Sequence, residues 1–376
     1  MHIKVNRQSF LTAMRVVEKA IKENKIKPIL SCVHIKTKEN KLNFCGTNLD
    51  NTIKTSIEIE ELITHGEIAF HFPMIDEYLK EIKEDSITLR VENGTDLFIE
   101  TDDSVTEFAV FTAEDYPSNF DNINLNENIL KFEMTNTELV EIFEKVIFAA
   151  DTPDNIAMSC VRIESVLKHL HFVATNTYRL AFLKKVFSRD IEDFAVSVPA
   201  DAITSLIKIL KGAEEDVVRV YQEAAHLYFV YKNIVIITKL VEIRFPDYIK
   251  ILSNSSYDKK LIISAEKFMS TLKRVSIFSR ANAEAKYATT YEFKEGKMSV
   301  NALNDIAKIN EQVDVNFVGE DLKISLNVKF LIEFIQNIPK EKEIELEFRY
   351  SNSSVKVYEK DKEDYLYILM PLALRD

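Results

Sequence analysis

The stretch IKVNRQSFLTAMRVVEKAI, Ile3–Ile21, has the pattern of a short strand, a polar break and an amphipathic helix. The same pattern returns at Leu130–Ala149 and at Leu261–Arg280. Three residues mark the matching points and lie 129 and 130 positions apart: Val5, Met134 and Ser264. A unit of this length has the size of a whole domain, whereas solenoid repeats recur after about 20–50 residues.

A second pattern lies inside each repeat, an alternating strand followed at once by a helix start. Pro73 and Pro199 are expected in the first turns of two such helices, and Asn327 is expected to cap the third. Strands of period two follow each of these helices. The chain is therefore predicted to be an α+β protein, in which each domain holds two helices packed on antiparallel sheets. The expected domains are residues 1–125, 126–255 and 256–376.

Composition narrows the class of protein. The chain has 376 residues, of which 46% are hydrophobic, enough for three separate cores. It contains no apolar run of membrane-spanning length and no signal-peptide pattern at its N-terminus. Cys32, Cys45 and Cys160 lack metal-type spacing and are expected to be reduced thiols. These features predict a cytoplasmic location and no membrane partner.

Charge is distributed unevenly. The net charge is −12, yet residues 6–27 hold six basic and two acidic side chains, net +4, and residues 264–281 hold four and one, net +3. A basic stripe on an acidic body is typical of a nucleic-acid footprint, although a solvated helix face gives the same pattern. Arg15, Lys19 and Lys22 lie opposite the apolar face of the first helix. Ile277 lies on the polar face of the third-repeat helix, beside Phe278, which predicts a contact surface there.

No catalytic constellation is evident. Neither GxxxxGK[ST] nor GxGxxG occurs, and there is no HExxH motif or nucleophile elbow. His169 and His171 share a strand face and would suit a metal, but no partner residue has metal-type spacing and a surface strand pair is the favoured interpretation. Asp151 and Asp154 would suit a divalent ion, or are simply acidic loop residues. We therefore expect no catalytic residue, no metal and no cofactor.

Several segments resemble one family. They are FVATNTYRLAF (Phe172–Phe182), TKLVEIRFPDY (Thr238–Tyr248) and LMPLALR (Leu369–Arg375). In their order and spacing they are similar to the bacterial DNA polymerase III β subunits, the DNA sliding clamps, and the similarity extends over the whole chain. The resemblance implies three clamp domains per subunit and a head-to-tail homodimer closed into a ring around double-stranded DNA.

The resemblance also implies a non-enzymatic function. Such a ring confers processivity on the replicative polymerase, through its α subunit, without gripping DNA. The clamp loader, other polymerases and mismatch-repair proteins dock short linear motifs in a hydrophobic pocket between the second and third domains. The corresponding residues of this chain are Met158, Thr175, Thr177, Tyr178, Arg179, Leu180, Pro246, Lys250, Ile251, Asn327, Phe330, Ser354, Ile368, Leu369, Met370, Pro371 and Leu372.

Some positions depart from the family pattern. Thr177 stands where the family has Gly, and Tyr178 where it has His, and both would alter the pocket. The expected DNA contacts are Arg15, Lys19, Lys22, Lys25 and Lys273, and the expected dimer contacts are Phe108, Ile277 and Phe278. Two alternatives stay open. One is a partner-binding scaffold of the same fold with weakened DNA encirclement, which acidic helices favour, and the other is a hydrolase with an unrecognised metal site.

Overall fold

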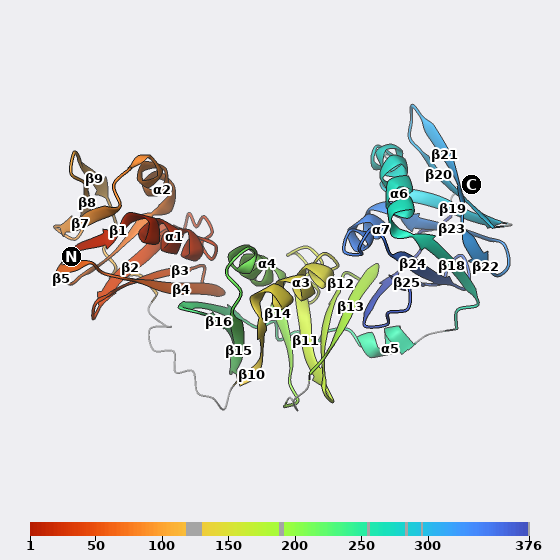
Figure 1. The fold of residues 1–376 in the computed structure, drawn as a ribbon, viewed down its shortest axis with the longest axis horizontal. Helices are drawn as coiled ribbons and strands as arrows, with labels where there is room; N and C mark the ends of the chain where they lie inside the picture. The colour runs from red at the N-terminus through yellow and green to blue at the C-terminus, as the bar shows by residue number, and fades with distance from the viewer. Residues whose placement is uncertain (118–129, 188–191, 254–255, 283–284, 295, 375–376) are drawn as a thin grey trace. The chain divides into compact units, whose positions relative to one another are not determined.

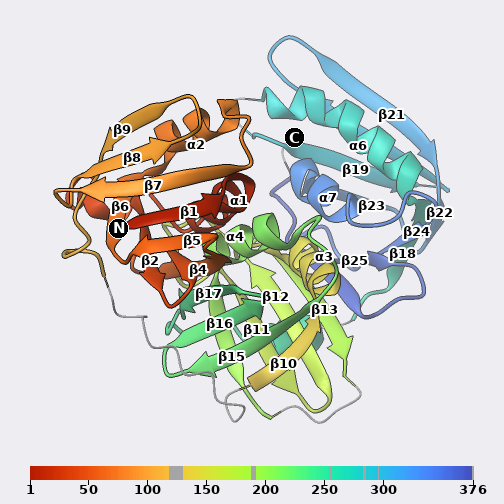
Figure 2. The same cartoon turned by 60° about the vertical axis from the view of Figure 1, so that its left-hand side comes forward.

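The computed structural model describes residues 1–117, 130–187, 192–253, 256–282, 285–294 and 296–374 (Figures 1 and 2). The chain divides into two compact units, one made of Met1–Val140 with Asp201–Leu240 and the other of Glu141–Ala200 with Val241–Asp376. Within the described residues, no helix is long and apolar enough to cross a membrane. The expected domain junctions at 125/126 and 255/256, and Arg375 of the last family segment, lie in or beside positions outside the described residues.

The helices begin where the sequence provides caps. Asn6, Thr135 and Ser264 each accept a hydrogen bond from the backbone N–H three residues later, at 2.9, 3.2 and 3.5 Å. The caps are spaced 129 and 129 residues apart, so Ser264 is equivalent to Asn6 rather than to Val5. The helices are α1 (Arg7–Glu18), α2 (Phe72–Glu81), α3 (Asn136–Ile147), α4 (Ala200–Leu210), α5 (Tyr248–Ser253), α6 (Ala265–Arg280) and α7 (Val328–Ile335), with a short 3₁₀ helix at Pro28–Ser31.

The first unit contains two antiparallel sheets, with strand orders β5-β1-β7-β8-β9 and β10-β15-β16-β17-β4-β3-β2-β6. The second of these sheets joins strands of two different repeats. The strands are β1 (His2–Asn6), β2 (Cys32–Lys38), β3 (Lys41–Thr47), β4 (Asn51–Glu58), β5 (Glu61–Thr64), β6 (Glu67–His71), β7 (Ser86–Glu92), β8 (Asp96–Glu100), β9 (Val105–Ala109), β10 (Leu130–Thr135), β15 (Val217–Glu223), β16 (His226–Tyr231) and β17 (Ile234–Lys239).

The second unit also contains two antiparallel sheets, with strand orders β14-β11-β12-β13-β26-β25-β24-β18-β22 and β21-β20-β19-β23. Here too one sheet joins two repeats. The strands are β11 (Cys160–Val166), β12 (His169–Thr175), β13 (Arg179–Val186), β14 (Ala195–Pro199), β18 (Lys259–Ser264), β19 (Ala288–Lys294), β20 (Lys297–Leu303), β21 (Lys308–Asp314), β22 (Asn316–Val318), β23 (Leu322–Asn327), β24 (Glu343–Phe348), β25 (Val355–Glu359) and β26 (Tyr365–Leu369).

Strand pairing fixes the equivalence of the repeats. Cys32 pairs with His71, Cys160 with Pro199, and Ala288 with Asn327. The first members of these pairs are spaced 128 residues apart, and so are the second members. His71 rather than Pro73 is therefore the equivalent of Pro199. Pro73 does lie in the first turn of α2, as expected, whereas Pro199 ends β14 one residue before α4.

Two of the sequence expectations for helices are confirmed. The side chain of Asn327 caps α7, because its Oδ1 accepts hydrogen bonds from the N–H groups of Lys329 and Phe330 at 3.0 and 3.3 Å. The apolar face of α1 is buried, and the ring of Phe10 lies 5.2 Å from that of Phe44. In the third repeat α6 packs beside α7 (Figure 1). The α+β fold, with two helices and antiparallel sheets in each repeat, is thereby confirmed.

Candidate functional site

One turn is built three times from an asparagine. The Oδ1 atom of Asn176 accepts hydrogen bonds from the N–H groups of Tyr178 and Arg179, both at 3.2 Å. Asn48 and Asn304 make the same pair of contacts in the first and third repeats, at 2.8–3.1 Å. Asparagine side chains stabilise turns in this way because the amide oxygen mimics a backbone acceptor. The turn that carries Thr177 and Tyr178 is thus a feature that all three repeats share.

The family position occupied by glycine is strained here. Thr177 has a φ of 72°, a left-handed conformation that β-branched residues rarely adopt. The hydroxyl of Thr175 helps to hold the turn by donating to the Arg179 carbonyl at 2.7 Å. The turn presents Tyr178 to solvent, and the Tyr178 carbonyl accepts a hydrogen bond from the N–H of Met370 at 2.8 Å. Tyr178 and Met370, both predicted pocket residues, therefore lie next to each other.

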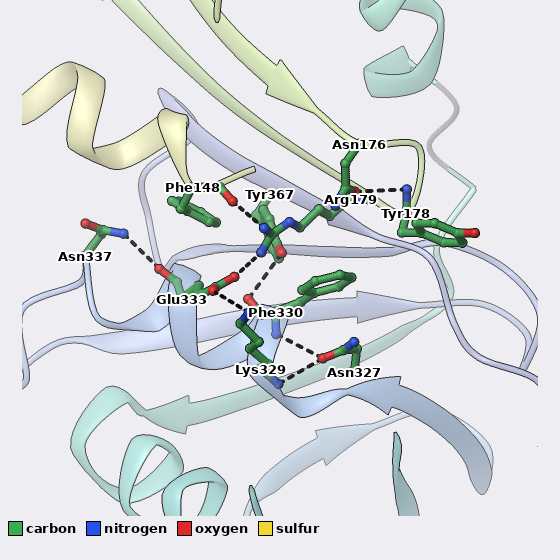
Figure 3. Close-up of polar contacts among 10 residues, drawn as sticks. All are labelled: Phe148, Asn176, Tyr178, Arg179, Asn327, Lys329, Phe330, Glu333, Asn337 and Tyr367. Atoms are coloured by element: carbon green, nitrogen blue, oxygen red, sulfur yellow. Dashed lines mark hydrogen bonds and ion pairs between the residues drawn. The ribbon is translucent and has the colours of Figure 1, made fainter. Parts of the chain in front are cut away.

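Arg179 is buried, although we expected it in the pocket wall. Its guanidinium pairs with Glu333 of α7 and donates to the carbonyl of Phe148, which follows α3 (Figure 3). The same group lies 4.1 Å from the ring centroid of Phe330 and 5.4 Å from that of Phe148. Figure 3 shows these side chains, together with Tyr367, converging on Arg179. Arg179 therefore connects α3, β13 and α7.

The predicted pocket residues are divided between two faces of the β13–β26 ladder. Leu180 lies opposite Ile368, and both belong to a buried cluster with Phe245 and Tyr248. The next pair along the ladder, Arg179 and Leu369, projects from the other face, because side chains alternate along a strand. Phe330 is on this second side, beneath Arg179. The structure thus brings Leu180, Ile368 and the segment around Pro246 together, and separates them from Arg179.

The other predicted residues are placed as follows. Pro246 lies between the clustered Phe245 and Tyr248, and Lys250 and Ile251 follow on α5, where both are exposed. Ser354 precedes Val355, which pairs with Leu369 across β25 and β26. The half-buried residues at the margin of the region are Met158, Pro371 and Leu372, and Thr175 is buried. Among the described residues, neither Met158 nor Ser354 forms a hydrogen bond with Leu180 or Ile368.

The histidine pair is not the surface pair that we allowed for. His171 is buried, and its Nδ1 lies 2.9 Å from the hydroxyl of Tyr248. Burial lowers the pKa of His171 and raises that of Tyr248, since each ring loses hydration of its charged form. Among the residues that the structure describes, no group of three or more His, Cys, Asp or Glu side chains could hold a metal ion.

Arg15 and Lys22, two of the predicted DNA contacts, form ion pairs with residues of the same unit that are distant in the sequence. The Nε of Arg15 lies 2.6 Å from Oδ1 of Asp76, a buried carboxylate on α2 that also pairs with Lys80. The Nζ of Lys22 lies 2.6 Å from Oδ2 of Asp201, in the first turn of α4. The positive charge of Arg15 and Lys22 is therefore partly neutralised in place.

The remaining predicted DNA contacts are more available. Lys19 is half-buried and lies 3.3 Å from its neighbour Glu18. Lys25 and Lys273 are exposed, and neither forms an ion pair with a described residue. Of the five cations, Lys25 and Lys273 therefore have the fewest competing contacts.

The predicted dimer contacts lie at an exposed edge and on an exposed helix face. Phe108 is half-buried on β9, and its ring lies 5.6 Å from that of Tyr78. Ile277 is 59% exposed near the end of α6, and Phe278 is half-buried. Among the described strands, β9 pairs only with β8, so one of its edges is open.

Sequence reasoning missed the partners of the basic residues. Asp76, Asp201 and Glu333 are each the carboxylate that holds a predicted functional cation. Helical periodicity predicted which face of α1 carries Arg15 and Lys22, but it contains no information about the helix on the other side.

Comparisons with known proteins agree over the whole chain. Models of three successive domains of the DNA polymerase III beta subunit match it, the N-terminal domain at residues 1–121, the central domain at 133–247 and the C-terminal domain at 254–373. The chain is 24% identical to the beta sliding clamp of Pseudomonas aeruginosa over 380 aligned residues, with 100% of both proteins covered. It is also 24% identical to that of Buchnera aphidicola, with 92% of each covered.

Solved structures of the same kind share the fold. The DNA polymerase III beta subunit of Thermotoga maritima has a TM-score of 0.89 at 23% identity and covers 100% of both chains. A Pseudomonas aeruginosa sliding clamp bound to griselimycin has a TM-score of 0.88 at 23% identity, again with 100% of both chains covered.

Proposed function

Because this chain belongs to the DNA polymerase III beta subunit family, we propose that it acts as a DNA sliding clamp, a homodimeric ring that encircles duplex DNA. The observation that carries the proposal is the way its repeats join. The repeats join at two places within the chain, which we call internal joints. In each joint the last strand of one repeat pairs with the third strand of another repeat's sheet, β17 with β4 and β26 with β13. Strands β9 and β21 form no such joint among the described residues, and we propose that they form a third joint of the same kind between two copies of the chain.

The two internal joints are alike in detail. In the first, Lys239 donates its N–H to the carbonyl of Asp50, and in the second Met370 donates to the carbonyl of Tyr178, both at 2.8 Å. In both joints, the residue four positions after the turn asparagine, Asn48 or Asn176, lies opposite an equivalent residue of the added strand. Thr52 lies opposite Ile237, and Leu180 lies opposite Ile368. The pairing of β17 with β4 therefore has the same register as the pairing of β26 with β13.

Two strands at sheet edges correspond to the strands of these joints. Strand β9 is the last strand of the first repeat, like β17 and β26 in theirs, and β21 is the third sheet strand of the third repeat, like β4 and β13 in theirs. Phe111 bridges to Ala69 as Leu372 bridges to Ser325, which makes Glu107 the equivalent of Ile368. Lys308 lies four residues after Asn304, so it is the equivalent of Leu180. A third joint would place Glu107 of one copy opposite Lys308 of the other, an attractive pair. It would also join a 5-stranded and a 4-stranded sheet into a 9-stranded one, the size already present in the second unit.

The contact residues predicted from the sequence suit this joint. Phe108 lies on β9, and Ile277 and Phe278 lie at the end of α6 in the repeat that carries β21. An exposed Ile beside a half-buried Phe loses its unfavourable hydration when covered. We therefore propose Phe108, Ile277 and Phe278 as dimer contacts, and residues 1–125, 126–255 and 256–376 as the three domains of each subunit.

A ring holds DNA by topology, so weak long-range attraction to phosphates is enough. Lys25 and Lys273 supply this attraction most directly, with Lys19, Arg15 and Lys22 contributing less because carboxylates lie beside them. Attraction of this kind weakens with salt, since counterions screen the phosphates. No base-specific contact and no catalytic residue is needed for sliding.

Partner recruitment is the second part of the proposal. We propose that the outer side of the β13–β26 ladder, around Leu180, Ile368 and Pro246, receives peptide motifs of the replicative polymerase α subunit, the clamp loader, other polymerases and mismatch-repair proteins. Its support is an apolar cluster flanked by exposed Tyr178 and Met370. A relative has been solved with griselimycin bound, and a ligand site on that clamp is consistent with such a groove.

The alternative is a partner-binding scaffold with weakened DNA encirclement. The observation in its favour is that Asp76 and Asp201 neutralise Arg15 and Lys22. The test is to load the protein onto nicked circular DNA with a matching clamp loader and ATP, and then to linearise the DNA. The clamp reading expects retention on circles and release after cutting. Failure to be retained by a folded, dimeric protein would favour the scaffold, and an Ile277→Asp/Phe278→Asp variant is the matched control that should never be retained.

A further inference from the structure

Equivalent positions on the sheets of the three repeats are occupied differently. Aromatic side chains pack on this position in the first and second repeats, whereas a cavity lies there in the third. In the first repeat the strand positions Cys32, Cys45 and Ala69 form a cluster with Tyr116. In the second repeat Cys160 and Val173 occupy the positions of Cys32 and Cys45 and cluster with Phe245 and Tyr248. In the third repeat the corresponding residues are Ala288, Asn301 and Ser325, and together they line a cavity of about 720 Å³.

The covering rings are held by polar contacts as well as by packing. Tyr116 is buried, donates its hydroxyl proton to the carbonyl of Cys45 at 3.1 Å and stacks on His34 at 4.5 Å. Tyr248 is buried too and hydrogen-bonds His171. Both segments have the local sequence Asp-Tyr, at Asp115-Tyr116 and Asp247-Tyr248. The chain itself thus shows twice what kind of segment this sheet position accepts.

The third-repeat cavity corresponds to the sheet position that an aromatic segment covers in the other two repeats, and the described residues leave it uncovered here. Leu372 pairs with Ser325 as Val241 pairs with Ser197, but the described residues after it, Ala373 and Leu374, carry no ring. The volume falls within the range of ligand pockets, about 300–1,000 Å³. Its described walls combine apolar and amide side chains, among them Leu303, Asn301 and Asn310, with two cations, Lys286 and Lys308, and no acid.

Exposed apolar side chains lie in and next to the lining segments. Leu303 lines the cavity and is 51% exposed. Leu374, which follows the lining residue Ala373 in the sequence, is 40% exposed, and Ile306, in the turn between β20 and β21, is 94% exposed. Clustered exposed apolar residues mark interaction surfaces more often than free solvent. In a dimer joined as proposed above, Lys308 would face Glu107, so Lys286 is the cation left for an incoming carboxylate.

We propose that this cavity is a second docking site, for an extended segment of a partner protein that carries a Tyr or Phe beside an acidic residue. The aromatic ring would take the place that Tyr116 and Phe245–Tyr248 fill in the other repeats, and its acidic neighbour would meet Lys286. The site lies on β19, β20, β21 and β23 and shares only Leu372 with the pocket predicted from the sequence. It is therefore distinct from the groove at Leu180 and Ile368.

The probe is a labelled peptide with the chain's own covering sequence, IRFPDYIKILS, residues 243–253, added to the full chain without DNA. We expect saturable binding by fluorescence anisotropy, and about tenfold or more weaker binding for the peptide with Tyr248→Ala, since a buried ring dominates such contacts. Ala288→Trp should fill the cavity and abolish binding. Glu292→Trp, on the same face of β19 but outside the cavity, is the matched control and should bind normally.

A benzophenone cross-linker at the Tyr248 position of the peptide locates the contact. Cross-links within residues 285–310 support the proposal, whereas cross-links to Leu180 or Ile368 overturn it. Absence of binding to the wild-type chain, or binding unchanged by Ala288→Trp in a variant with native circular dichroism and melting temperature, also overturns it. If Ala288→Trp alone changes the oligomeric state, the occupant is a second copy of the chain and the peptide proposal fails.

Discussion

Arg179 lies over the face of Phe330, with 4.1 Å between the guanidinium carbon and the ring centroid, while the same guanidinium pairs with Glu333 one turn along α7. Removing one member of a buried ion pair leaves the other charge without compensation. We expect Arg179→Ala to lower the free energy of unfolding by about 3 kcal/mol. Urea denaturation measures this loss, and Lys329→Ala, which removes an exposed cation from the same helix, should cost much less.

A double-mutant cycle separates the ion pair from the stacking. Glu333→Gln in the Arg179→Ala background should cost less than Glu333→Gln alone, because the carboxylate has then already lost its partner. Additive losses would show that Arg179 acts through the Phe330 and Phe148 rings rather than through Glu333.

Thr177→Gly is expected to stabilise the protein. The left-handed backbone costs a β-branched residue about 1 kcal/mol relative to glycine, so the free energy of unfolding should rise by about that amount. Leu49→Gly is the matched variant, since Leu49 occupies the same turn position in the first repeat with a φ of 78°. Thermal melting reports the change, and an unaltered or lowered melting temperature for Thr177→Gly would show that the turn carries no such strain.

Asp76 makes stability depend on acid. Burial alone would raise the pKa of Asp76, but hydrogen bonds from Arg15 and Lys80 outweigh burial and hold the pKa below its usual 3.8. Stabilisation by a carboxylate of depressed pKa is complete above the unfolded-state value and is lost as pH falls through the folded-state value.

The free energy of unfolding of the wild type should therefore drop more steeply below about pH 4 than that of Asp76→Asn. The two proteins are compared by denaturation from neutral pH downward. Asp102→Asn, which changes an exposed carboxylate, is the control and should follow the wild type. Parallel curves for wild type and Asp76→Asn would contradict the prediction.

Charge on the end of α6 should prevent dimerisation. Ile277→Asp together with Phe278→Asp would force two carboxylates into the proposed apolar contact, so we expect a folded monomer in sedimentation or light scattering. Lys273→Asp, one turn earlier on the exposed face, is the comparison that should remain dimeric. A doubly substituted chain that stays dimeric removes Ile277 and Phe278 from the interface.

The register of the proposed joint has its own test. Glu107→Lys would place two cations opposite each other and should weaken the dimer, whereas Glu107→Lys combined with Lys308→Glu should restore it. An exposed pair contributes about 0.2–1 kcal/mol, so the shift in the monomer–dimer equilibrium is a few-fold. Restoration by the swap distinguishes this register from any other pairing of β9 with β21, which would leave the double variant as weak as the single one.

Much of the fold follows from local pattern. The cap at Asn327 was expected from the sequence, and Asn6, Thr135 and Ser264 are cap-forming residues in the polar break before the first helix of each repeat. The buried face of α1, which includes Phe10 and Val17, follows from the helical period, and Leu11, beside that face, is buried as well. Pro199 was misplaced by a residue because a proline is accepted both at the end of an edge strand and in a first helical turn.

The candidate sites depend on contacts that no local pattern contains. Asp76 lies 61 residues from Arg15, and Glu333 lies 154 residues from Arg179, so neither partner is visible in the period of one helix. The division of the pocket residues between two faces likewise depends on the register of β13 against β26. Resemblance to a family supplied the pocket set, but only the structure shows that Arg179 and Leu180 both lie on β13, where alternation along the strand sends their side chains to opposite faces.

The joint between β4 and β17 has a consequence for synthesis on the ribosome. Strand β4 ends at Glu58, and its partner begins only at Ile234, so translation at about 5–20 residues per second leaves that sheet edge unpaired for roughly 10–35 s. An open edge invites pairing with strands of other nascent chains on the same messenger. Lys54 and Glu58 place charge on the waiting strand, a protection that a hydrophobic replacement would remove at the cost of aggregation during expression rather than of stability afterwards.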